Sequence, residues 1–353
     1  MKGLILSGGY GTRLRPLTYS QQKQLIPVAN KSILFYAIED VIEAGAKEIG
    51  IIVGPNKEQV METVNKARAN FDAKMIFIEQ DAPRGLAHAV LISEDFIGDE
   101  PFVMYLGDNI LREGIIEHAK AFEERNYDAS IMLTEVENPQ QFGVAELNAE
   151  GTIKRLVEKP KVPPSNLALV GIYFFEPVIL EACKSIKPSW RNELEITDAI
   201  QWLIDNGYKV GWTKVEGWWK DTGKPEDILE ANRLILDDIK TKNEGTAENS
   251  RIIGRVIIEK GVKIKDSIVK GPAIVGKECM IRRSYIGPYT SIGNNCVIED
   301  TEIEDSIVMD GSAIIGGGRI IESLIGKDVK IRRKAELPNG RKLIIGDNSE
   351  IVG

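Results

Sequence analysis

Isoleucines recur at an interval of six over the last hundred residues of this chain. The longest periodic series is Ile268, Ile274, Met280, Ile286, Ile292 and Ile298. An α-helix would give an interval near 3.6, and a plain strand an interval of two. Six matches a β-solenoid whose triangular coil has three six-residue sides. The sequence therefore predicts a β-solenoid over 251–353, because an ordinary β-sandwich does not explain the fixed period.

The composition changes where the repeat begins. All five Trp and all nine Phe lie before residue 220, and the only aromatic residues after 245 are Tyr285 and Tyr289. The segment 243–250 is small and polar, which is typical of a linker. It follows an apolar pattern that predicts an amphipathic helix over 226–242. We therefore predict a first domain over 1–242, a linker over 243–250 and the solenoid domain after it.

The first domain alternates short apolar runs with helix-like segments. Strands are predicted over 2–6, 48–53, 74–78 and 102–106, and helices over 33–44, 57–69 and 86–96. This alternation predicts an α/β, Rossmann-like doubly wound fold, with a mainly parallel sheet and helices on both faces. Such sheets bind ligands at the carboxyl ends of their strands. The loops after Leu6 and Leu106 are therefore expected to hold the chemistry.

Charge and residue counts exclude several classes of protein. The chain has 45 Lys and Arg against 53 Asp and Glu, a net charge of −8, which argues against a basic nucleic-acid scaffold. Its three Cys form no C-x-x-C pair, and its only His are His88 and His118, so disulfide frameworks and His-rich metal sites are not expected. No run of about 18 apolar residues and no signal peptide is present. We expect a cytoplasmic protein without membrane or nucleic-acid partners.

A glycine-rich loop follows the first predicted strand. The segment 6–14 reads Leu-Ser-Gly-Gly-Tyr-Gly-Thr-Arg-Leu, and Lys23 lies ten residues after Arg13. Closely spaced glycines let the backbone turn its amides toward an anion, and the planar guanidinium suits phosphate oxygens. The spacing matches neither the P-loop nor the dinucleotide-binding fingerprint. A phosphate-binding loop is favoured over a plain glycine-rich turn. A P-loop-like run at 271–277 lacks the Ser or Thr and falls inside the solenoid repeat.

Two acidic residues are candidate metal ligands. Asp108 lies two residues after Leu106, where the predicted strand ends, and Asp221 lies in a glycine-bounded aromatic segment. Mg²⁺ prefers one or two carboxylates together with phosphates and water. A structural turn is the alternative for Asp108. The adjacent Glu158 and Lys159 form a weaker pattern, in which a lysine could hold a second anion and a glutamate could accept sugar hydroxyls.

The ordered set of motifs resembles the sugar-1-phosphate nucleotidyltransferases. The motifs are Gly-Gly-x-Gly-Thr-Arg, Lys-Gln-Leu-Ile-Pro, Leu-Gly-Asp-Asn, Glu-Lys-Pro, Glu-Leu-Glu-Ile-Thr-Asp and Asp-Thr-Gly. The resemblance covers nearly the whole chain and is strongest to the branch that uses dTTP and glucose 1-phosphate and carries a C-terminal left-handed β-helix. It implies a Mg²⁺-assisted transfer of a nucleotidyl group to the sugar phosphate, with release of pyrophosphate.

The resemblance also implies residue roles. The residues expected at the nucleotide are Gly8, Gly9, Gly11, Thr12, Arg13, Lys23, Gln80 and Gly85. The residues expected at the sugar phosphate are Asp108, Gly143, Glu158, Lys159, Val170 and Arg191, with Asp108 and Asp221 as Mg²⁺ ligands. The residues expected to act in catalysis are Arg13, Lys23, Asp108 and Lys159. The chain departs from the pattern at Phe142, where Tyr is common, at Asn192, where Gly is common, and in having Arg84 in the base-reading loop.

Three alternatives stay open from the sequence. A related transferase could use UTP or another sugar phosphate with the same chemistry. A hexapeptide acyltransferase would need a solenoid histidine as base, and this solenoid has none. A non-catalytic homologue should have lost the phosphate and metal residues, which are all present. The faces and end coils of a solenoid could pair subunits, so we expect a homo-oligomer.

Overall fold

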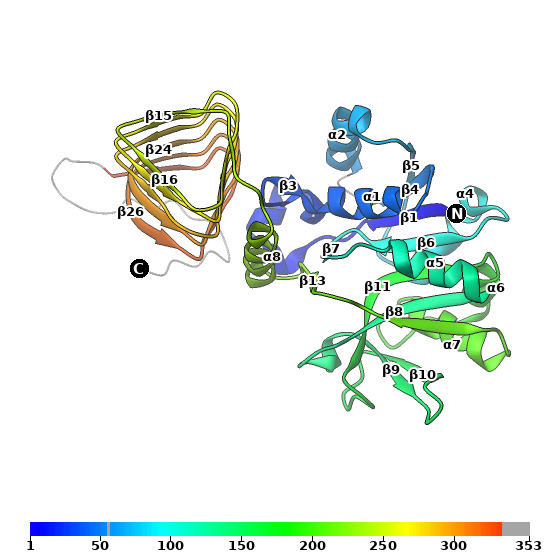
Figure 1. The fold of residues 1–353 in the computed structure, drawn as a ribbon. Helices are drawn as coiled ribbons and strands as arrows, with labels where there is room; N and C mark the ends of the chain where they lie inside the picture. Colours follow the sequence, from blue (N-terminus) through cyan, green and yellow to red (C-terminus); the bar gives the residue numbers. More distant parts are fainter. Residues whose placement is uncertain (55–56, 334–353) are drawn as a thin grey trace. The chain divides into compact units, whose positions relative to one another are not determined.

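The computed structural model describes residues 1–54 and 57–333 and forms two compact units (Figure 1). The first unit contains 1–10, 21–25 and 33–221. The second contains 11–20, 26–32 and the chain from 222 onward. The boundary between the units therefore lies earlier than the predicted 242, and two short N-terminal segments group with the solenoid. Within the described part of the chain, no helix is long and apolar enough to cross a membrane.

A nine-stranded mixed sheet forms the first unit. Strands β6, β1, β4 and β5 pair in parallel, with β5 at one edge, and β11, β9 and β10 continue the sheet in antiparallel pairing. The bounds are β1 Lys2–Ser7, β4 Glu48–Val53, β5 Lys74–Glu79, β6 Phe102–Leu106, β8 Ala129–Glu135, β9 Gly143–Leu147, β10 Ile153–Glu158, β11 Leu167–Phe175 and β12 Val210–Lys214. A separate pair joins β7 Asn109–Leu111 to β13 Trp219–Asp221. The prediction of parallel pairing therefore holds for β1, β4, β5 and β6, and the later part of the sheet is mixed.

Helices cover both faces of this sheet, as the alternation of elements predicts. In β1, Leu4 and Leu6 pack with α3, α6 and α7, whereas Ile5 packs with α1, α2 and α5. Successive side chains of a strand point to opposite faces, so one apolar strand can serve two cores. The bounds are α1 Ile33–Glu43, α2 Lys57–Ala67, α3 Leu86–Leu91, α4 Glu94–Ile97, α5 Ile116–Arg125, α6 Ile179–Ser185 and α7 Ile196–Asp205, with short 3-10 turns η1 Thr12–Leu14, η2 Leu17–Tyr19, η3 Lys23–Leu25, η4 Arg68–Asn70 and η5 Pro139–Gln141. The doubly wound α/β prediction is confirmed.

Two predicted helices differ by more than two residues from the helices of the structure. The helix predicted over 86–96 is split into α3 and α4, because the buried hydroxyl of Ser93 donates to the carbonyl of Ala89 at 2.8 Å. The helix predicted over 226–242 is α8 Pro225–Asp237.

The solenoid consists of stacked parallel coils (Figure 1). Its strands are β14 Lys242–Asn243, β15 Thr246–Glu248, β16 Arg251–Ile253, β17 Val256–Ile258, β18 Lys263–Lys265, β19 Ile268–Lys270, β20 Ala273–Val275, β21 Met280–Arg282, β22 Tyr285–Ile286, β23 Thr290–Ile292, β24 Val297–Glu304, β25 Ile307–Val308, β26 Ala313–Ile321, β27 Leu324–Ile325 and β28 Lys330–Arg332. Each strand pairs with the strand one coil later. This agrees with the predicted left-handed parallel β-helix.

The coils are 17 residues long, apart from the 16 residues between Val297 and Ala313, and this corrects the strict period of six. Thr246 pairs with Lys263, and Lys263 with Met280. The inward residues that stack in the core are Ile264, Val269, Val275, Ile281, Ile286, Ile292 and Ile298. Consecutive inward residues are separated by five, six and six positions in the sequence, and this pattern then repeats. Asp266 (φ 50°) and Arg283 (φ 44°) lie within the five-residue intervals, and corner residues of the longer sides, such as Glu278 (57°) and Asn295 (57°), also have a positive φ.

The predicted linker over 243–250 instead forms part of the first coil. Strand β14 pairs with β17, and β15 pairs with β18. Small polar residues are compatible with a free linker, but a chain running along the edge of a coil can satisfy its backbone groups by pairing. The composition of the segment could not show that such an edge lies beside it.

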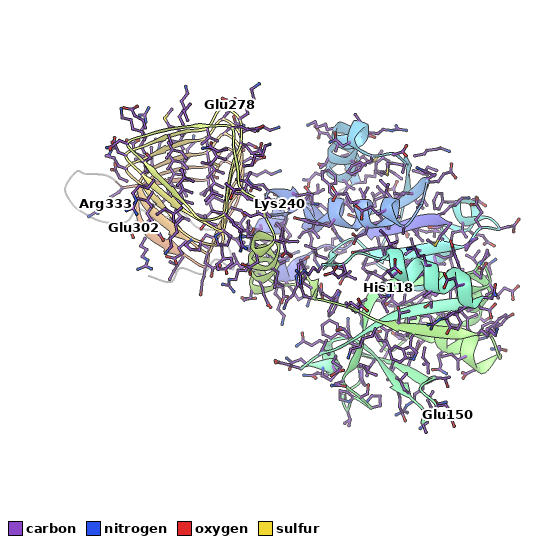
Figure 2. The ribbon with its side chains drawn as sticks, in the orientation of Figure 1. His118, Glu150, Lys240, Glu278, Glu302 and Arg333 are labelled. Atoms are coloured by element: carbon purple, nitrogen blue, oxygen red, sulfur yellow. The ribbon has the colours of Figure 1, made fainter. Side chains whose placement is uncertain are left out.

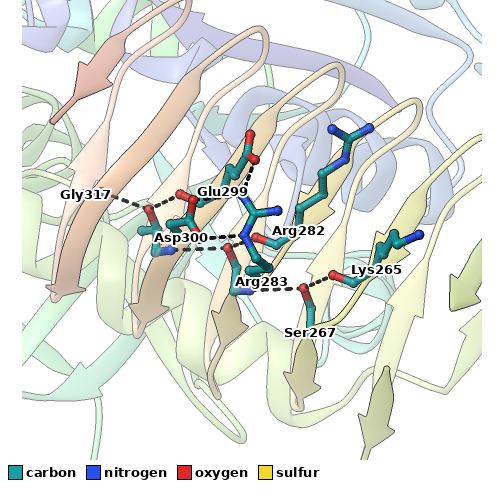
Figure 3. Close-up of polar contacts among 9 residues, drawn as sticks. Lys265, Ser267, Arg282, Arg283, Glu299, Asp300 and Gly317 are labelled. Carbon is teal, nitrogen blue, oxygen red and sulfur yellow. Dashed lines mark hydrogen bonds and ion pairs between the residues drawn. The ribbon is translucent and has the colours of Figure 1, made fainter. Parts of the chain in front are cut away.

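Hydroxyl groups satisfy the backbone at one solenoid corner (Figure 3). The amide of Ser284 donates to Ser267 Oγ at 3.1 Å, and the amide of Thr301 donates to Ser284 Oγ at 3.3 Å. Outside this ladder, Arg283 Nε donates to Asp300 Oδ1 at 2.8 Å. These contacts join neighbouring coils where the β-ladder is interrupted by the turn.

Candidate functional site

The carboxyl ends of four parallel strands meet at one edge of the sheet. Ser7 pairs with Val53, and Val53 pairs with Glu79, so Gly8, Gly54 and Gln80 follow side by side. A Cβ on Gly54 would lie 2.5 Å from the carbonyl oxygen of Gly8. The first turn of the glycine-rich loop therefore packs directly on a second glycine, at the edge where the sequence predicts a ligand.

A buried amide shapes this turn. Gln22 Nε2 donates to the carbonyl oxygens of Ser7 and Gly9, at 2.9 Å each. In the sequence Gln22 stands in a polar run after Ser20, and nothing in that run indicates that it would bind the backbone of the glycine-rich loop. The structure therefore adds Gln22 to the residues that shape the loop.

The second half of the glycine-rich loop belongs to the second unit. Gly11 has a φ of 61°, and its carbonyl accepts a hydrogen bond of 2.7 Å from Thr18 Oγ1. Thr12 and Arg13 form the 3-10 turn η1. The guanidinium of Arg13 lies against Gly223, two residues after Asp221 in the chain.

A lysine and two carboxylates gather in the first unit. Lys23 Nζ donates to the Asp108 carboxylate and lies 3.9 Å from Asp221 Oδ1. Strand pairing is the cause, because β7 and β13 place Asp221 opposite Asn109. The Lys23 residue is only 7% exposed, so this charge is held inside the protein. Residues far apart in the chain therefore converge, as the sequence predicts.

Asn109 orients the Asp108 side chain. Its Nδ2 donates to Asp108 Oδ1 at 3.1 Å and to the carbonyl of Leu106 at 3.3 Å, and its Oδ1 accepts from Trp219 Nε1 at 2.7 Å. Trp219 in turn packs edge-on against Phe142, with ring centroids 5.4 Å apart. A single buried amide thus links the strand that carries Asp221 to the turn that carries Asp108. Sequence reasoning did not select Asn109 or Trp219.

The carboxylate pair suits a magnesium ion that substrate phosphates help to coordinate. No cluster of three or more His, Cys, Asp or Glu suited to a metal occurs among residues 1–54 and 57–333. Asp108 and Asp221 supply two hard oxygen ligands beside Lys23. Mg²⁺ commonly takes this number of carboxylates and completes its shell with phosphate and water. The donor set therefore fits the predicted ion.

The predicted base-reading residues also meet. Gln80 Nε2 lies 3.3 Å from the carbonyl of Gly85 and 3.1 Å from His88 Nδ1. An amide nitrogen can only donate, so Nδ1 accepts and the ring is neutral. Burial and the nearby Arg84 charge lower the pKa of His88, which favours this neutral form. Arg84 itself is exposed and paired with Asp81 at 2.5 Å.

The residues predicted for the sugar phosphate form a second cluster. Strands β9 and β10 place Gly143 opposite Glu158. Glu158 Oε1 lies 3.5 Å from Arg191 Nη1 and 3.8 Å from Lys159 Nζ. Burial raises the pKa of Glu158, with a contribution from Glu195, although Lys159 and Arg191 act in the opposite direction. The structure therefore brings an acceptor carboxylate and two cations together.

Val170 differs from the others. Its side chain is 1% exposed and packs in the apolar core between the sheet and helices α1, α2 and α5. Only its backbone could face a ligand. The other histidine, His118 of α5, lies 2.7 Å from Thr213 Oγ1 (Figure 2). This half-buried hydrogen bond joins helix α5 to strand β12 and thus connects a helix to the sheet.

Comparison with known proteins decides the family. A nucleotidyl transferase family model matches residues 2–238. The chain belongs to the nucleotidyl transferase family. It is a sugar-1-phosphate nucleotidyltransferase, because relatives that match along nearly its full length carry this activity.

Three similar proteins show how far the likeness extends. The nucleotidyltransferase is 48% identical to a glucose-1-phosphate thymidylyltransferase of Streptomyces antibioticus, over 99% of both chains. It is 47% identical to the low-salt glycan biosynthesis nucleotidyltransferase Agl11 of Haloferax volcanii, again over 99% of both chains. A solved UDP-glucose pyrophosphorylase in complex with UDP-glucose superposes with a TM-score of 0.61 at 28% identity, covering 67% of this chain and 98% of that one.

Proposed function

We propose that this nucleotidyltransferase joins dTTP and glucose 1-phosphate to give dTDP-glucose and pyrophosphate. The observation that carries the proposal is the convergence of Lys23, Asp108 and Asp221. The relative from Streptomyces antibioticus supports the choice of base and sugar. An oxygen of the sugar phosphate attacks the α-phosphorus of the nucleotide in line, and the bond to pyrophosphate breaks. The nucleophile is already ionised, so no general base is required.

Positioning and charge neutralisation supply the catalysis in this proposal. On the nucleotide side the amides of Gly8, Gly9, Gly11 and Thr12 bind the phosphates, and Arg13 and Lys23 stabilise the leaving pyrophosphate. Asp108 and Asp221 would hold Mg²⁺, which neutralises charge at the α-phosphate when bound. Gln80 and the backbone at Gly85 contact the pyrimidine.

The second cluster holds the nucleophile. Glu158, Gly143 and the backbone of Val170 contact the sugar, and Lys159 and Arg191 bind its phosphate. Lys159 and Arg191 flank the Glu158 carboxylate. The cations therefore lie where they can offset the repulsion between two anionic substrates.

A panel of substrates tests the proposal. The protein is incubated with Mg²⁺, with dTTP, UTP and other NTPs and dNTPs, and with the 1-phosphates of glucose, galactose, mannose and N-acetylglucosamine, and pyrophosphate is measured. Thymine exceeds uracil by one methyl group, worth about 1–3 kcal/mol in a fitted pocket. We expect the highest kcat/KM for dTTP with glucose 1-phosphate. A clear preference for UTP or another sugar would replace the assignment, and no release from any pair would refute it.

The same substrate panel can also test for acyl transfer. Both His lie before residue 119, so the solenoid lacks a histidine base. Wells with acetyl-CoA and glucosamine 1-phosphate are therefore expected to show no release of free CoA.

We expect Trp219→Phe to lower kcat/KM about tenfold, or about 1.4 kcal/mol. The phenyl ring keeps the contact with Phe142, but Asn109 Oδ1 loses the donor that orients it. Trp212→Phe on β12 is the matched control, since it removes an indole hydrogen bond of 2.8 Å to the carbonyl of Gly151. Equal kinetics for the two variants would contradict the role of Trp219.

Glu158 predicts a pH dependence of opposite sign for binding and stability. Its pKa is raised in the folded protein, so the carboxylate is lost at a higher pH than the ordinary value of about 4.3. Affinity for the sugar is expected to fall as the pH drops through this raised pKa. The free energy of unfolding changes in the opposite direction. It falls as the pH rises from the unfolded pKa of Glu158 to its folded pKa, because the buried group must then carry a charge, and it is lowest above the folded pKa.

Glu158→Gln separates the two effects. Binding of dTDP-glucose is measured by calorimetry, because its diphosphate, unlike a phosphate monoester, does not gain a proton near pH 6. The variant should bind more weakly at pH 8, lose the acidic decline in affinity, and unfold at a higher Tm at pH 8 but not at pH 4. An unchanged acidic decline would exclude Glu158 as its source.

A further inference from the structure

The hairpin that follows Lys23 has a strained tip. Strands β2 Pro27–Val28 and β3 Lys31–Ser32 are joined by Ala29 and Asn30. These two residues have φ values of 48° and 61°. Positive φ at both central positions favours Gly, Asn and Asp, and an alanine there carries a steric penalty. Surrounding contacts must therefore hold this conformation.

Two hydrogen bonds from elsewhere in the second unit hold the tip. The amide of Ala29 donates to Asn232 Oδ1 at 2.9 Å, and Asn30 Nδ2 donates to the carbonyl of Ile292 at 2.7 Å. Asn232 lies on α8, and Ile292 ends the solenoid strand β23. We call this pair of contacts the hairpin clamp.

The clamp is anchored in a buried polar network. Asn232 is fully buried, and its Oδ1 also accepts from Ser291 Oγ at 2.7 Å while its Nδ2 donates to the carbonyl of Tyr289 at 2.9 Å. Arg233 pairs with Asp305 through two nitrogens of its guanidinium. Helix α8 is thereby fixed to the outer side of the solenoid, so the hairpin tip is held against a rigid surface.

The chain between the clamp and Lys23 has little freedom. Only Gln24, Leu25 and Ile26 separate Lys23 from the hairpin, and all three are buried. On the other side, β3 runs directly into α1, which begins at Ile33. The conformation of the tip therefore constrains the path of the backbone that carries Lys23.

We propose that the solenoid is a positioning element for Lys23, acting through the hairpin clamp. Asn30 and Asn232 are positioning residues, because they reach the lysine only through the hairpin. This inference rests on the proposed function of Lys23 at the nucleotide phosphates. It gives the solenoid a role in the transferase reaction itself, beyond packing or assembly.

Asn30→Gly tests the clamp with little change to the backbone. Glycine adopts a positive φ without strain, so the variant removes the side-chain bond to Ile292 and keeps the turn. Ala29→Gly is the matched control, because it keeps the amide donor to Asn232 and relieves strain. We expect Asn30→Gly to lower kcat/KM about tenfold and Ala29→Gly to change it less than about twofold.

A double-mutant cycle distinguishes positioning from general destabilisation. If the clamp acts through Lys23, adding Asn30→Gly to the Lys23→Ala variant should lower its residual kcat/KM by less than about twofold. The same substitution is expected to lower the kcat/KM of the wild-type protein about tenfold. A purely structural contact would give effects that multiply. Multiplying effects, or wild-type kinetics for Asn30→Gly, would overturn the proposal.

Hydrogen exchange gives a readout that does not need turnover. The amides of 23–25 should exchange at least about threefold faster in Asn30→Gly than in Ala29→Gly, because the loss of the clamp allows local opening. Equal exchange in the two variants would overturn the clamp. If no substrate pair released pyrophosphate in the wild-type protein, the proposed function would fail, and this measurement would still decide whether the clamp orders the lysine segment.

Discussion

Asp108→Asn is expected to lower kcat/KM by about 100-fold or more, equivalent to about 3 kcal/mol at 1.36 kcal/mol per decade. The substitution keeps the shape of the side chain but removes the negative charge that contacts Lys23 and that would bind Mg²⁺. Asn109 would then face an amide that offers it one oxygen in place of a carboxylate. We therefore expect the loss to appear in kcat, with an increased requirement for Mg²⁺.

Steady-state pyrophosphate release over a range of Mg²⁺ concentrations measures this effect. Asp72→Asn is a matched control, because Asp72 is an exposed acid that pairs with the surface Lys47. The control should retain wild-type kinetics within about twofold, since surface pairs contribute little. Near-wild-type turnover of Asp108→Asn would remove Asp108 from the metal site.

Gly85→Ala is expected to reduce nucleotide use by about 100-fold and to destabilise the fold by about 1–3 kcal/mol. Gly85 has a φ of 103°, and a Cβ there would lie 2.6 Å from the amide nitrogen of Leu194 and 2.8 Å from its carbonyl carbon. The backbone of Leu194 cannot easily move away, because it bonds to Arg84 and Ala87 at 2.8 and 3.0 Å. The loop that carries Gln80 would have to shift instead.

Gly45→Ala separates the crowding from the strain. Gly45 has a φ of 97°, but no atom lies within 4 Å of an added Cβ. Both variants should lose stability in thermal unfolding, and only Gly85→Ala should show a raised KM for the nucleotide. If Gly45→Ala raised that KM equally, the contact with Leu194 would not be the cause.

Local patterns predicted the architecture well. The strands at 48–53 and 102–106 were predicted with the bounds that the structure has, since short apolar runs between turn residues fit buried parallel strands. The solenoid followed from the repeat of isoleucines. The 17-residue length of its coil could not be predicted from that repeat. Ile268 and Ile274 fit the interval of six, but the inward residues are Val269 and Val275, one position later in each case.

The candidate site was predicted in part. Asp108 and Lys23 lie in short motifs whose residue types indicate ligand contacts, whereas the role expected of Gln80 came from the family resemblance. Gln22 and Asn109 are ordinary polar residues, and their importance arises from burial and from the groups that they contact. Neither property is visible in one chain without its fold.

The amino-acid sequence alone was sufficient for features that neighbouring residues encode. Periodicity and turns depend on backbone geometry over a few positions, which is why the α/β domain and the solenoid could be predicted. The meeting of Asp108 with Asp221, and of Asn30 with the solenoid, depends on the pairing of β7 with β13 and on the packing of α8. The motifs indicated that Asp108 and Asp221 could share a metal ion. The strand pairing and the hairpin contacts that bring such distant residues together form only when whole elements pack, so they are seen only in the folded protein.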